Sequence, residues 1–175
     1  AASIPATHAD RLRSAEASGR VAVVLAERGG PAPSALMTRA AFRNALVVLQ
    51  AIGGSTNALI HLTAVAGRLG IAIDLDEVDA LGREVPVLVD LKPSGQHYME
   101  HFHWAGGVPR LLHELRDQLD LGARCVEGTT LGERIANVDV RDAQDVIRSR
   151  GDPISAGGGM FVPIDDHTTW RYNYG

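Results

Sequence analysis

The amino-acid sequence predicts a helix-rich α/β fold with few short strands. In most stretches, apolar residues recur at the three- and four-residue spacing of an amphipathic helix, and only short runs have the branched composition of a strand. Glycine pairs and prolines separate these stretches. We expect roughly six helices against two or three short strands, which are too few to make a stable sheet alone. The missing strands are therefore expected to lie outside this chain.

The first half of the chain is expected to hold four helices. Thr38 and Ser55 are suited to cap two of them, and Asp74 with Glu77 has the spacing of a capping box. The helix after Ser55 is apolar almost all round, so we expect it to be buried on most sides. Residues 71–73 are expected to form a short strand. The four helices are predicted at residues 8–28, 39–52, 55–70 and 74–83.

The second half is expected to mix strands, turns and helices. Its best strand candidate is residues 86–91, a short branched run bounded by turn residues, and residues 93–95 should turn the chain. Thr130 and Glu133 have capping-box spacing at the start of a short helix. The other expected elements are helices at residues 96–105 and 109–121, a loop at 151–159 and a strand starting within 160–164.

Composition narrows the possible functions. The chain has 175 residues, a formal net charge of −4 and 5% aromatic residues, which fits about one domain with an aliphatic core. The absence of a basic run argues against a nucleic-acid partner. A single cysteine, Cys125, excludes an internal disulfide framework and an all-cysteine metal site. No apolar run approaches the ~20 residues that cross a bilayer, and no signal peptide is visible, so we expect a cytoplasmic protein without a membrane partner.

Both ends of the chain are unusual. The sequence starts at Ala1 without an initiator methionine. It ends in a polar aromatic stretch, residues 170–175, that is unlike the sequence before it. We therefore expect the chain to be a piece of a longer protein, or a processed or rearranged product.

The first candidate site is Gly53-Gly54-Ser55-Thr56-Asn57. The glycines allow close backbone approach, and three hydrogen-bonding side chains start the next helix. A helix N-terminus concentrates unpaired N–H groups and about half a positive charge, so it can hold a carboxylate or phosphate. The alternative is a plain turn between helices, with glycine at the end of one and Ser or Thr capping the next.

A second candidate is the loop that begins at Lys92, the only lysine of the chain. Lys92 precedes Pro93-Ser94-Gly95 and can reach a substrate carboxylate from this loop, or it can simply be solvated. Residues 106–109, Gly-Gly-Val-Pro, indicate a sharp bend that is either structural or brings backbone N–H groups toward a ligand.

A third candidate is His97-Tyr98-Met99-Glu100-His101, which has the H-x-x-E-H pattern of one class of zinc peptidases. On a helix, His97 and His101 would lie on one face, as a zinc site requires. A third ligand is also needed, and the downstream carboxylates of Glu114 and Glu133 lie in no recognisable motif. The alternative is that these are histidines on a polar surface. Cys125 is interpreted as a small apolar residue and not as a nucleophile.

Several of these blocks, taken in order, resemble the dihydroxy-acid dehydratase / 6-phosphogluconate dehydratase family. The resemblance covers about residues 1–158 and includes the opening Ala2-Ser3-Ile4-Pro5-Ala6. The sequence of residues 92–100 leans toward the sugar-acid branch of the family. The blocks that carry the resemblance are residues 51–58, 86–95, 99–100, 105–109, 128–133, 147–148 and 152–155.

The resemblance implies a fold, a reaction and cofactors. Residues 1–150 would be the later part of an N-terminal α/β/α domain, 151–164 the hinge and start of a C-terminal domain, and 165–175 a divergent tail. Family members are homo-oligomeric hydro-lyases that act on a small-molecule hydroxy acid. They remove water from a 2,3-dihydroxy acid, either a branched-chain acid or a sugar acid, and give a 2-keto acid. A [2Fe-2S] or [4Fe-4S] cluster, usually with Mg²⁺, acts as Lewis acid, and a base takes the C2 proton.

This chain departs from the family pattern in its metal ligands. The cluster cysteines, the metal-binding Asp and Lys and the catalytic Ser of the family lie outside it, and Cys125 falls on no ligand position. The family usually has Asp at the position of His101, so one substitution creates the zinc-like pattern. We expect this chain alone to hold none of the cofactors and to be inactive. Its expected pocket residues are Gly54, Ser55, Thr56, Asn57, Lys92 and Ser94.

Two other functions stay open at this point. The chain can be a non-catalytic helical module that needs a partner chain, or a zinc hydrolase that uses His97, Glu100 and His101. Zinc at one equivalent that is lost on His97→Ala would favour the hydrolase.

Overall fold

The computed structural model describes residues 3–140 and 143–157. In these residues the chain is helix-rich, with isolated β-bridges but no regular strand, so the implied α/β/α arrangement stays a prediction. The helices are α1 (Ala9–Glu27), α2 (Pro33–Leu36), α3 (Arg39–Ala51), α4 (Thr56–Arg68), α5 (Leu75–Glu84), α6 (Met99–Trp104), α7 (Gly107–Glu114), the 3₁₀ turn η1 (Arg116–Gln118) and α8 (Leu131–Ile135).

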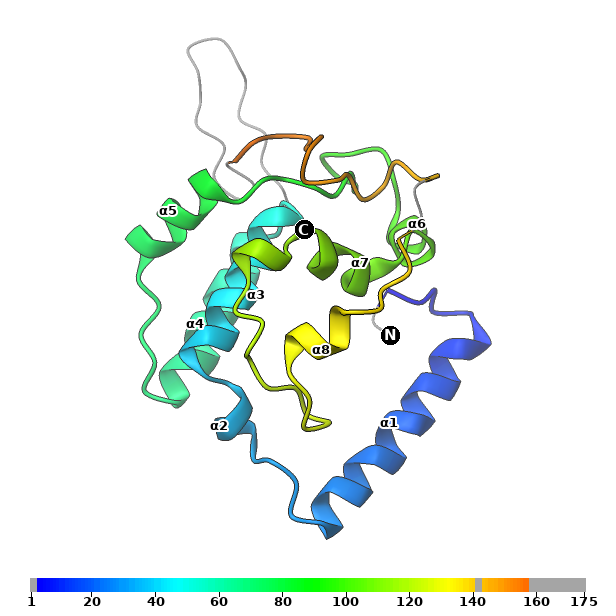
Figure 1. Cartoon of the computed structure of the whole chain (residues 1–175), viewed down its shortest axis with the longest axis vertical. Helices are drawn as coiled ribbons and strands as arrows, with labels where there is room; N and C mark the ends of the chain where they lie inside the picture. The colour runs from blue at the N-terminus through cyan, green and yellow to red at the C-terminus, as the bar shows by residue number, and fades with distance from the viewer. Residues whose placement is uncertain (1–2, 141–142, 158–175) are drawn as a thin grey trace.

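The helices form two groups. α3 packs against α4 and α5 in one group, and α7 packs against α6, η1 and α8 in the other. Figure 1 shows these groups side by side, with α1 along the lower right edge. No side chain of α1 is buried within the described residues. The described helices include none that is both long and apolar enough to cross a membrane.

Polar caps begin most of the predicted helices where the sequence placed them. Thr38 accepts a hydrogen bond from the Ala41 backbone, and Ser55 accepts one from Asn57. Asp74 also caps its helix, but Glu77 does not complete a capping box and instead lies 3.6 Å from Arg39. A short helix at α2, with Pro33 at its first position, and the turn η1 were not predicted.

Two expectations around α4 are wrong. Only Leu59 and Ala66 of this helix are buried, and Ile60 is 64% exposed. The reason is that α4 contacts α3 on one side, while within the described residues no other helix covers its remaining apolar surface in a comparable contact. Residues 71–73 form no strand, because the Ile71 backbone N–H closes the end of α4 by donating to Ala66.

The predicted strand at residues 86–91 is extended but is not part of a regular sheet. It makes isolated bridges from Val87 to Ser155, from Val89 to Ile147 and from Leu91 to His97. Because its neighbours change from residue to residue, no continuous ladder forms.

Helix boundaries nearby also differ from expectation. α6 begins at Met99 and not at residue 96, because His97 is engaged in the bridge to Leu91. α7 begins at Gly107, two residues before the proline, and ends at Glu114 with η1 after it. Residues 151–157 form the expected loop. The rest of that loop, the strand expected within 160–164 and the tail 165–175 lie outside the described residues.

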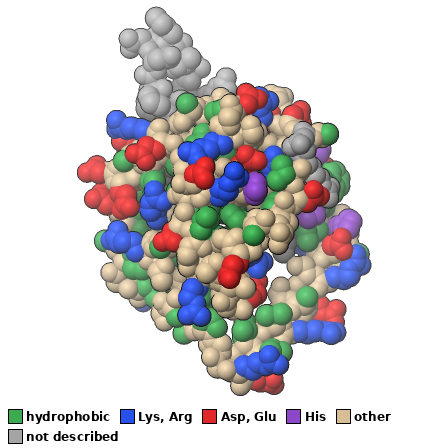
Figure 2. All heavy atoms as spheres, in the orientation of Figure 1, with side chains coloured by type: hydrophobic (Ala, Val, Ile, Leu, Met, Phe, Trp, Pro, Cys, Tyr) green, Lys and Arg blue, Asp and Glu red, His purple; other side chains and the backbone are tan. Residues whose placement is uncertain are grey.

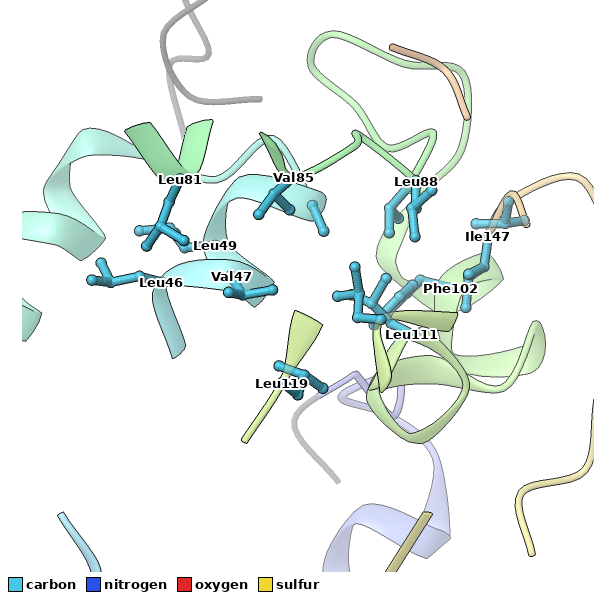
Figure 3. Packing of buried hydrophobic residues seen from close by; sticks show 14 of the residues in the cluster. Leu46, Val47, Leu49, Leu81, Val85, Leu88, Phe102, Leu111, Leu119 and Ile147 are labelled. Carbon is cyan, nitrogen blue, oxygen red and sulfur yellow. The ribbon is translucent and has the colours of Figure 1, made fainter. Parts of the chain in front are cut away.

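The core is aliphatic, as the scarcity of aromatic residues predicted. Figure 3 shows its side chains pointing toward one another from α3, α5, α6, α7 and the extended segments. Leu88, Leu111 and Leu115 are fully buried, and Phe102 is the one aromatic member of the described cluster. The cluster contains residues of both helix groups and therefore joins them. Each fully buried leucine contributes about 1.5–3 kcal/mol to the stability of this contact.

Asn44 ties α3 to the chain after η1. Its amide donates to the Asp120 carbonyl at 2.9 Å, and its side-chain oxygen accepts from the Asp120 N–H at 2.8 Å. The side chain is only 7% exposed. It therefore satisfies both backbone groups of a residue 76 positions away.

Replacing Asn44 by alanine should destabilise the protein by about 1–3 kcal/mol, because it removes two hydrogen bonds made by a buried side chain. Urea unfolding followed by circular dichroism measures this change. Asn57→Ala serves as the control, since Asn57 is exposed and its side chain accepts or donates no hydrogen bond among the described residues. A loss as small as that of Asn57→Ala would contradict the role given to Asn44.

The capping box of α8 should make stability depend on pH. The Thr130 N–H donates to Glu133 at 2.7 Å, and this bond, with that of the Thr130 hydroxyl, lowers the pKa of Glu133 from its usual 4.5. A lowered folded-state pKa stabilises the fold above pH 4.5, and the contribution is lost as pH falls through the folded-state pKa.

Glu133→Gln should therefore unfold more easily than the wild type near neutral pH, and the difference between them should shrink toward about pH 3. Urea titrations at the two pH values measure it. A difference that grows on acidification would contradict the assignment. Glu27→Gln, which changes an exposed carboxylate that forms no hydrogen bond or ion pair among the described residues, is the control.

Candidate functional site

The turn between α3 and α4 is a tight helix-to-helix connection. Gly53 has φ 61°, a conformation that favours glycine, and its N–H donates to the Gln50 carbonyl at 3.0 Å. A Cβ on Gly54 would lie 2.3 Å from Leu49 Cδ1, so a larger residue would require the buried Leu49 side chain to shift. Ser55 caps α4 by accepting from the Asn57 N–H at 3.1 Å. This local geometry matches the plain helix-turn interpretation of the motif.

Thr56 and Asn57 are the side chains of this turn that remain available. Both are exposed, and neither side chain forms a hydrogen bond with another described residue. Gly54 and Ser55 are half-buried and hold the backbone. The turn therefore presents one hydroxyl and one amide at the beginning of a helix of 13 residues.

The second candidate is the closed loop of residues 91–97. The Lys92 N–H donates to the His97 carbonyl at 2.8 Å, and the Gly95 N–H donates to Leu91 at 2.7 Å. Inside the loop, Asp90 accepts from the Gln96 N–H at 3.0 Å. A backbone bonded in this way gives the exposed Lys92 and Ser94 a defined position.

The helical geometry behind the zinc interpretation is wrong, because His97 lies outside α6, although its ring lies 5.6 Å from the ring of His101. His97 Nε2 faces two carboxylates instead, 3.3 Å from Asp145 and 3.8 Å from Asp90. His101 Nδ1 accepts a hydrogen bond from the Tyr98 N–H at 3.2 Å, so this nitrogen is not available to bind a metal ion. Residues 3–140 and 143–157 contain no group of three or more His, Cys, Asp or Glu side chains suited to a metal ion.

The bend at residues 106–109 is structural in the described part of the chain. Gly106 has φ 111° and precedes α7, and a Cβ there would lie 2.8 Å from the Arg110 side chain. Arg110 is buried and pairs with Glu114 at 2.8 Å. Close packing on this arginine explains the glycine without a ligand.

The extended segment of residues 86–91 connects the two candidate regions, because it is hydrogen-bonded to the end of α3 and leads into the loop of residues 91–97. Leu88, just before the loop, donates its N–H to the carbonyl of Ala51 at the end of α3. In Figure 1 the end of α3 and the segment leading to the loop both lie in the upper part of the molecule. No hydrogen bond joins the side chains of Thr56 or Asn57 to those of Lys92 or Ser94 among the described residues.

The candidate side chains lie on open surface. In Figure 2, acidic and basic side chains are interspersed over the visible face. The hollow on α5 is lined by other residues, namely Asp76, Asp79, Ala80, Arg83 and Glu84. A second, smaller hollow between α3 and residues 71–73 also contains none of the candidates.

Asp90 and Tyr98, which flank the loop of residues 91–97, were not among the pocket residues expected from the sequence. Tyr98 hydroxyl lies 2.8 Å from the Lys92 ammonium, and Asp90 holds the loop closed. The proline and glycine at positions 93 and 95 predicted a turn, and a turn brings its flanking residues together. The turn signal therefore indicates that the residues on either side of it lie close together, without specifying the contact between Lys92 and Tyr98.

Fold and candidate site together define a helix-rich domain that presents polar side chains on two loops. Residues 1–134 match the family described as dihydroxy-acid/6-phosphogluconate dehydratase, N-terminal. The chain belongs to this family, as its sequence motifs indicated.

Individual relatives carry two kinds of name. A "Dihydroxy-acid dehydratase" of Caldanaerobacter subterraneus subsp. tengcongensis is 42% identical over 161 residues, which cover 91% of this chain and 29% of that protein. An "L-arabinonate dehydratase" of Rhizobium leguminosarum bv. trifolii is 41% identical over 163 residues, covering 92% and 28%. An "L-arabonate dehydratase" of Azospirillum brasilense is 41% identical over 164 residues, with the same coverage. The chain spans less than a third of the length of these relatives.

Gly95→Ala should open the loop. Its Cβ would lie 2.1 Å from Asp90 Oδ1 and 2.6 Å from the Leu91 nitrogen, which no real contact tolerates. We expect the free energy of unfolding to fall by about 1–3 kcal/mol. We also expect the amide signals of residues 90–98 to shift in NMR spectra. Gly151→Ala is the matched control, because its Cβ would meet only Ser149 Oγ at 4.0 Å. Unchanged signals in Gly95→Ala would show that the loop is not closed as described.

Proposed function

We propose that this chain is part of a hydro-lyase that removes water from a 2,3-dihydroxy carboxylic acid to give a 2-keto acid. The observation that carries the proposal is the family match, together with relatives named as dehydratases that align over nine-tenths of the chain. The relatives carry names of both a dihydroxy-acid and a sugar-acid dehydratase, so both substrate classes stay in the proposal.

In this reaction a proton leaves C2 and a hydroxyl leaves C3, and the substrate carboxylate must be held while charge develops. The chain supplies groups for binding and orientation. Lys92 and Ser94 offer an ammonium and a hydroxyl from a closed loop, and Thr56 and Asn57 offer a hydroxyl and an amide at the start of α4. We assign substrate contacts to these four side chains, with Gly54 and Ser55 shaping the turn. We assign no catalytic residue to this chain.

The residues of this chain do not fit the iron–sulfur cluster of the family. Clusters are held by several cysteine thiolates, whereas Cys125 is the only cysteine of the sequence. Cys125 is half-exposed, and its N–H donates to Thr129 at 2.8 Å in a short turn. The described residues also contain no group of three or more His, Cys, Asp or Glu side chains that could hold a metal ion. We therefore propose that the chain alone is inactive and that other parts of the enzyme supply these cofactors.

The domain limits, location and assembly belong to the same proposal. We place the domain at residues 1–150, the hinge at 151–164 and a divergent tail at 165–175 of a cytoplasmic, homo-oligomeric enzyme that acts on a small hydroxy acid, with no nucleic-acid or membrane partner. The structure adds one detail within this scheme. Ser155, within the proposed hinge, forms a β-bridge with Val87 of the proposed domain.

A chimera tests the proposal. This chain replaces the aligned 163 residues of the Rhizobium leguminosarum L-arabinonate dehydratase, and turnover of L-arabinonate and of 2,3-dihydroxy-3-methylbutanoate is measured. Thr56→Val combined with Asn57→Ala should lower kcat/KM about 10- to 100-fold, the equivalent of one or two lost hydrogen bonds. His61→Ala, an exposed change further along the same helix, should leave kcat/KM unchanged.

Two results would contradict the proposal at different levels. A chimera that folds and carries its cluster but turns over neither acid contradicts the hydro-lyase function. An active chimera in which the double substitution keeps the original kcat and KM removes the turn from the substrate site. Circular dichroism and cluster absorbance establish folding and cluster content in each variant.

A further inference from the structure

We propose that Tyr98 and Lys92 act as a pair that binds the carboxylate group of the substrate. The inference deepens the proposed function and rests on it. It adds Tyr98 to the site and gives the pair one task, recognition of a carboxylate and not of the hydroxyl groups.

The direction of the bond between the two side chains follows from their chemistry. Lys92 Nζ lies 2.8 Å from Tyr98 Oη. An ammonium group has three donors and no acceptor, so Lys92 must donate and the phenol oxygen must accept. The hydroxyl proton of Tyr98 therefore points away from Lys92. Lys92 Nζ also lies 4.2 Å from the centre of the Tyr98 ring, an arrangement in which the ring attracts the cation.

This arrangement leaves several donors close together. Two ammonium protons and the hydroxyl proton remain, on two heavy atoms 2.8 Å apart. Within residues 3–140 and 143–157, Lys92 has no carboxylate within ion-pair distance. Both side chains are exposed, and Tyr98 is 54% exposed. A carboxylate has two oxygens that accept from neighbouring donors, and charge-assisted bonds of this kind are the stronger ones.

The backbone holds the pair before any ligand arrives. Leu91 and His97, the residues next to Lys92 and Tyr98, form a β-bridge, and Lys92 N–H donates to the His97 carbonyl. The two side chains thus leave adjacent backbone segments. Because the loop is already ordered, binding costs less conformational entropy than it would on a free lysine.

Nearby acidic groups face histidines and not the pair. Asp90 and Asp145 flank the ring of His97, at 3.8 and 3.3 Å. Glu100 lies 3.9 Å from Nε2 of His101. These three carboxylates lie around the loop, yet none of them forms an ion pair with Lys92 among the described residues.

The single lysine allows a direct test on the 175-residue chain. With ¹³C-labelled lysine, the side chain of Lys92 gives one set of signals, which is followed while L-arabinonate is added. We expect a saturable shift with L-arabinonate and none with the uncharged L-arabinitol. Tyr98→Phe keeps the ring but removes the hydroxyl, and should raise the dissociation constant about 5- to 10-fold, as expected for one lost hydrogen bond.

The controls separate the pair from general charge attraction. Arg124→Met removes a positive charge elsewhere and should leave the dissociation constant unchanged. An equal shift from sodium chloride or L-arabinitol, the absence of saturation, or an unchanged dissociation constant in Tyr98→Phe would each overturn the inference. An active chimera with an unchanged KM in Tyr98→Phe would overturn the pair but not the hydro-lyase function. A saturable shift together with a folded but inactive chimera would support carboxylate binding by the pair and contradict the hydro-lyase function.

Discussion

The extended segment of residues 86–91 is the constraint on which the rest of the described structure depends. It passes through the core, with Leu88 fully buried and Val89 4% exposed, so its backbone groups need partners inside the protein. The partners come from three places. Leu88 N–H donates to Ala51, Val87 N–H to Ser155, and Asp90 N–H to the Val146 carbonyl. One short segment thereby fixes the end of α3 and residues 146–155 around itself.

This arrangement positions the candidate site at both ends of the segment. On the N-terminal side, the hydrogen bond from Leu88 N–H to the Ala51 carbonyl fixes where α3 ends and hence where the turn to α4 begins. After it, Asp90 and Leu91 start the loop that presents Lys92. The polar side chains are exposed, but the backbone near them is hydrogen-bonded to a buried extended segment. A surface loop of this kind can present ligand-binding groups with little loss of entropy on binding, which is the usual advantage of loops on a rigid scaffold.

Sequence reasoning succeeded where the determining interactions are local. Caps at Thr38, Ser55 and Thr130 satisfy N–H groups within three residues, so residue type and spacing were enough. It failed where the partner is distant. The exposure of α4 depends on which neighbours cover it, and the backbone partners of Val87 and Leu88 lie more than 30 residues away on one side and more than 50 on the other. The same applies to the site, because the turn geometry was predictable, whereas His97 was placed on a helix although a bridge to Leu91 holds it outside α6.

The chemistry of dehydration explains why such a domain would leave the reaction itself to other parts of an enzyme. Removing a poor leaving group such as hydroxide requires strong stabilisation of the departing oxygen, and removing the C2 proton requires a base held beside it. The loops described here offer donors and one positive charge, which suit a carboxylate end of the substrate. Their neighbouring basic groups, the rings of His97 and His101, are engaged by Asp90, Asp145 and the Tyr98 backbone. In the function we propose, the chain therefore fixes where the acid is bound, and the position of the substrate relative to the cofactors follows from how the rest of the enzyme docks on this domain.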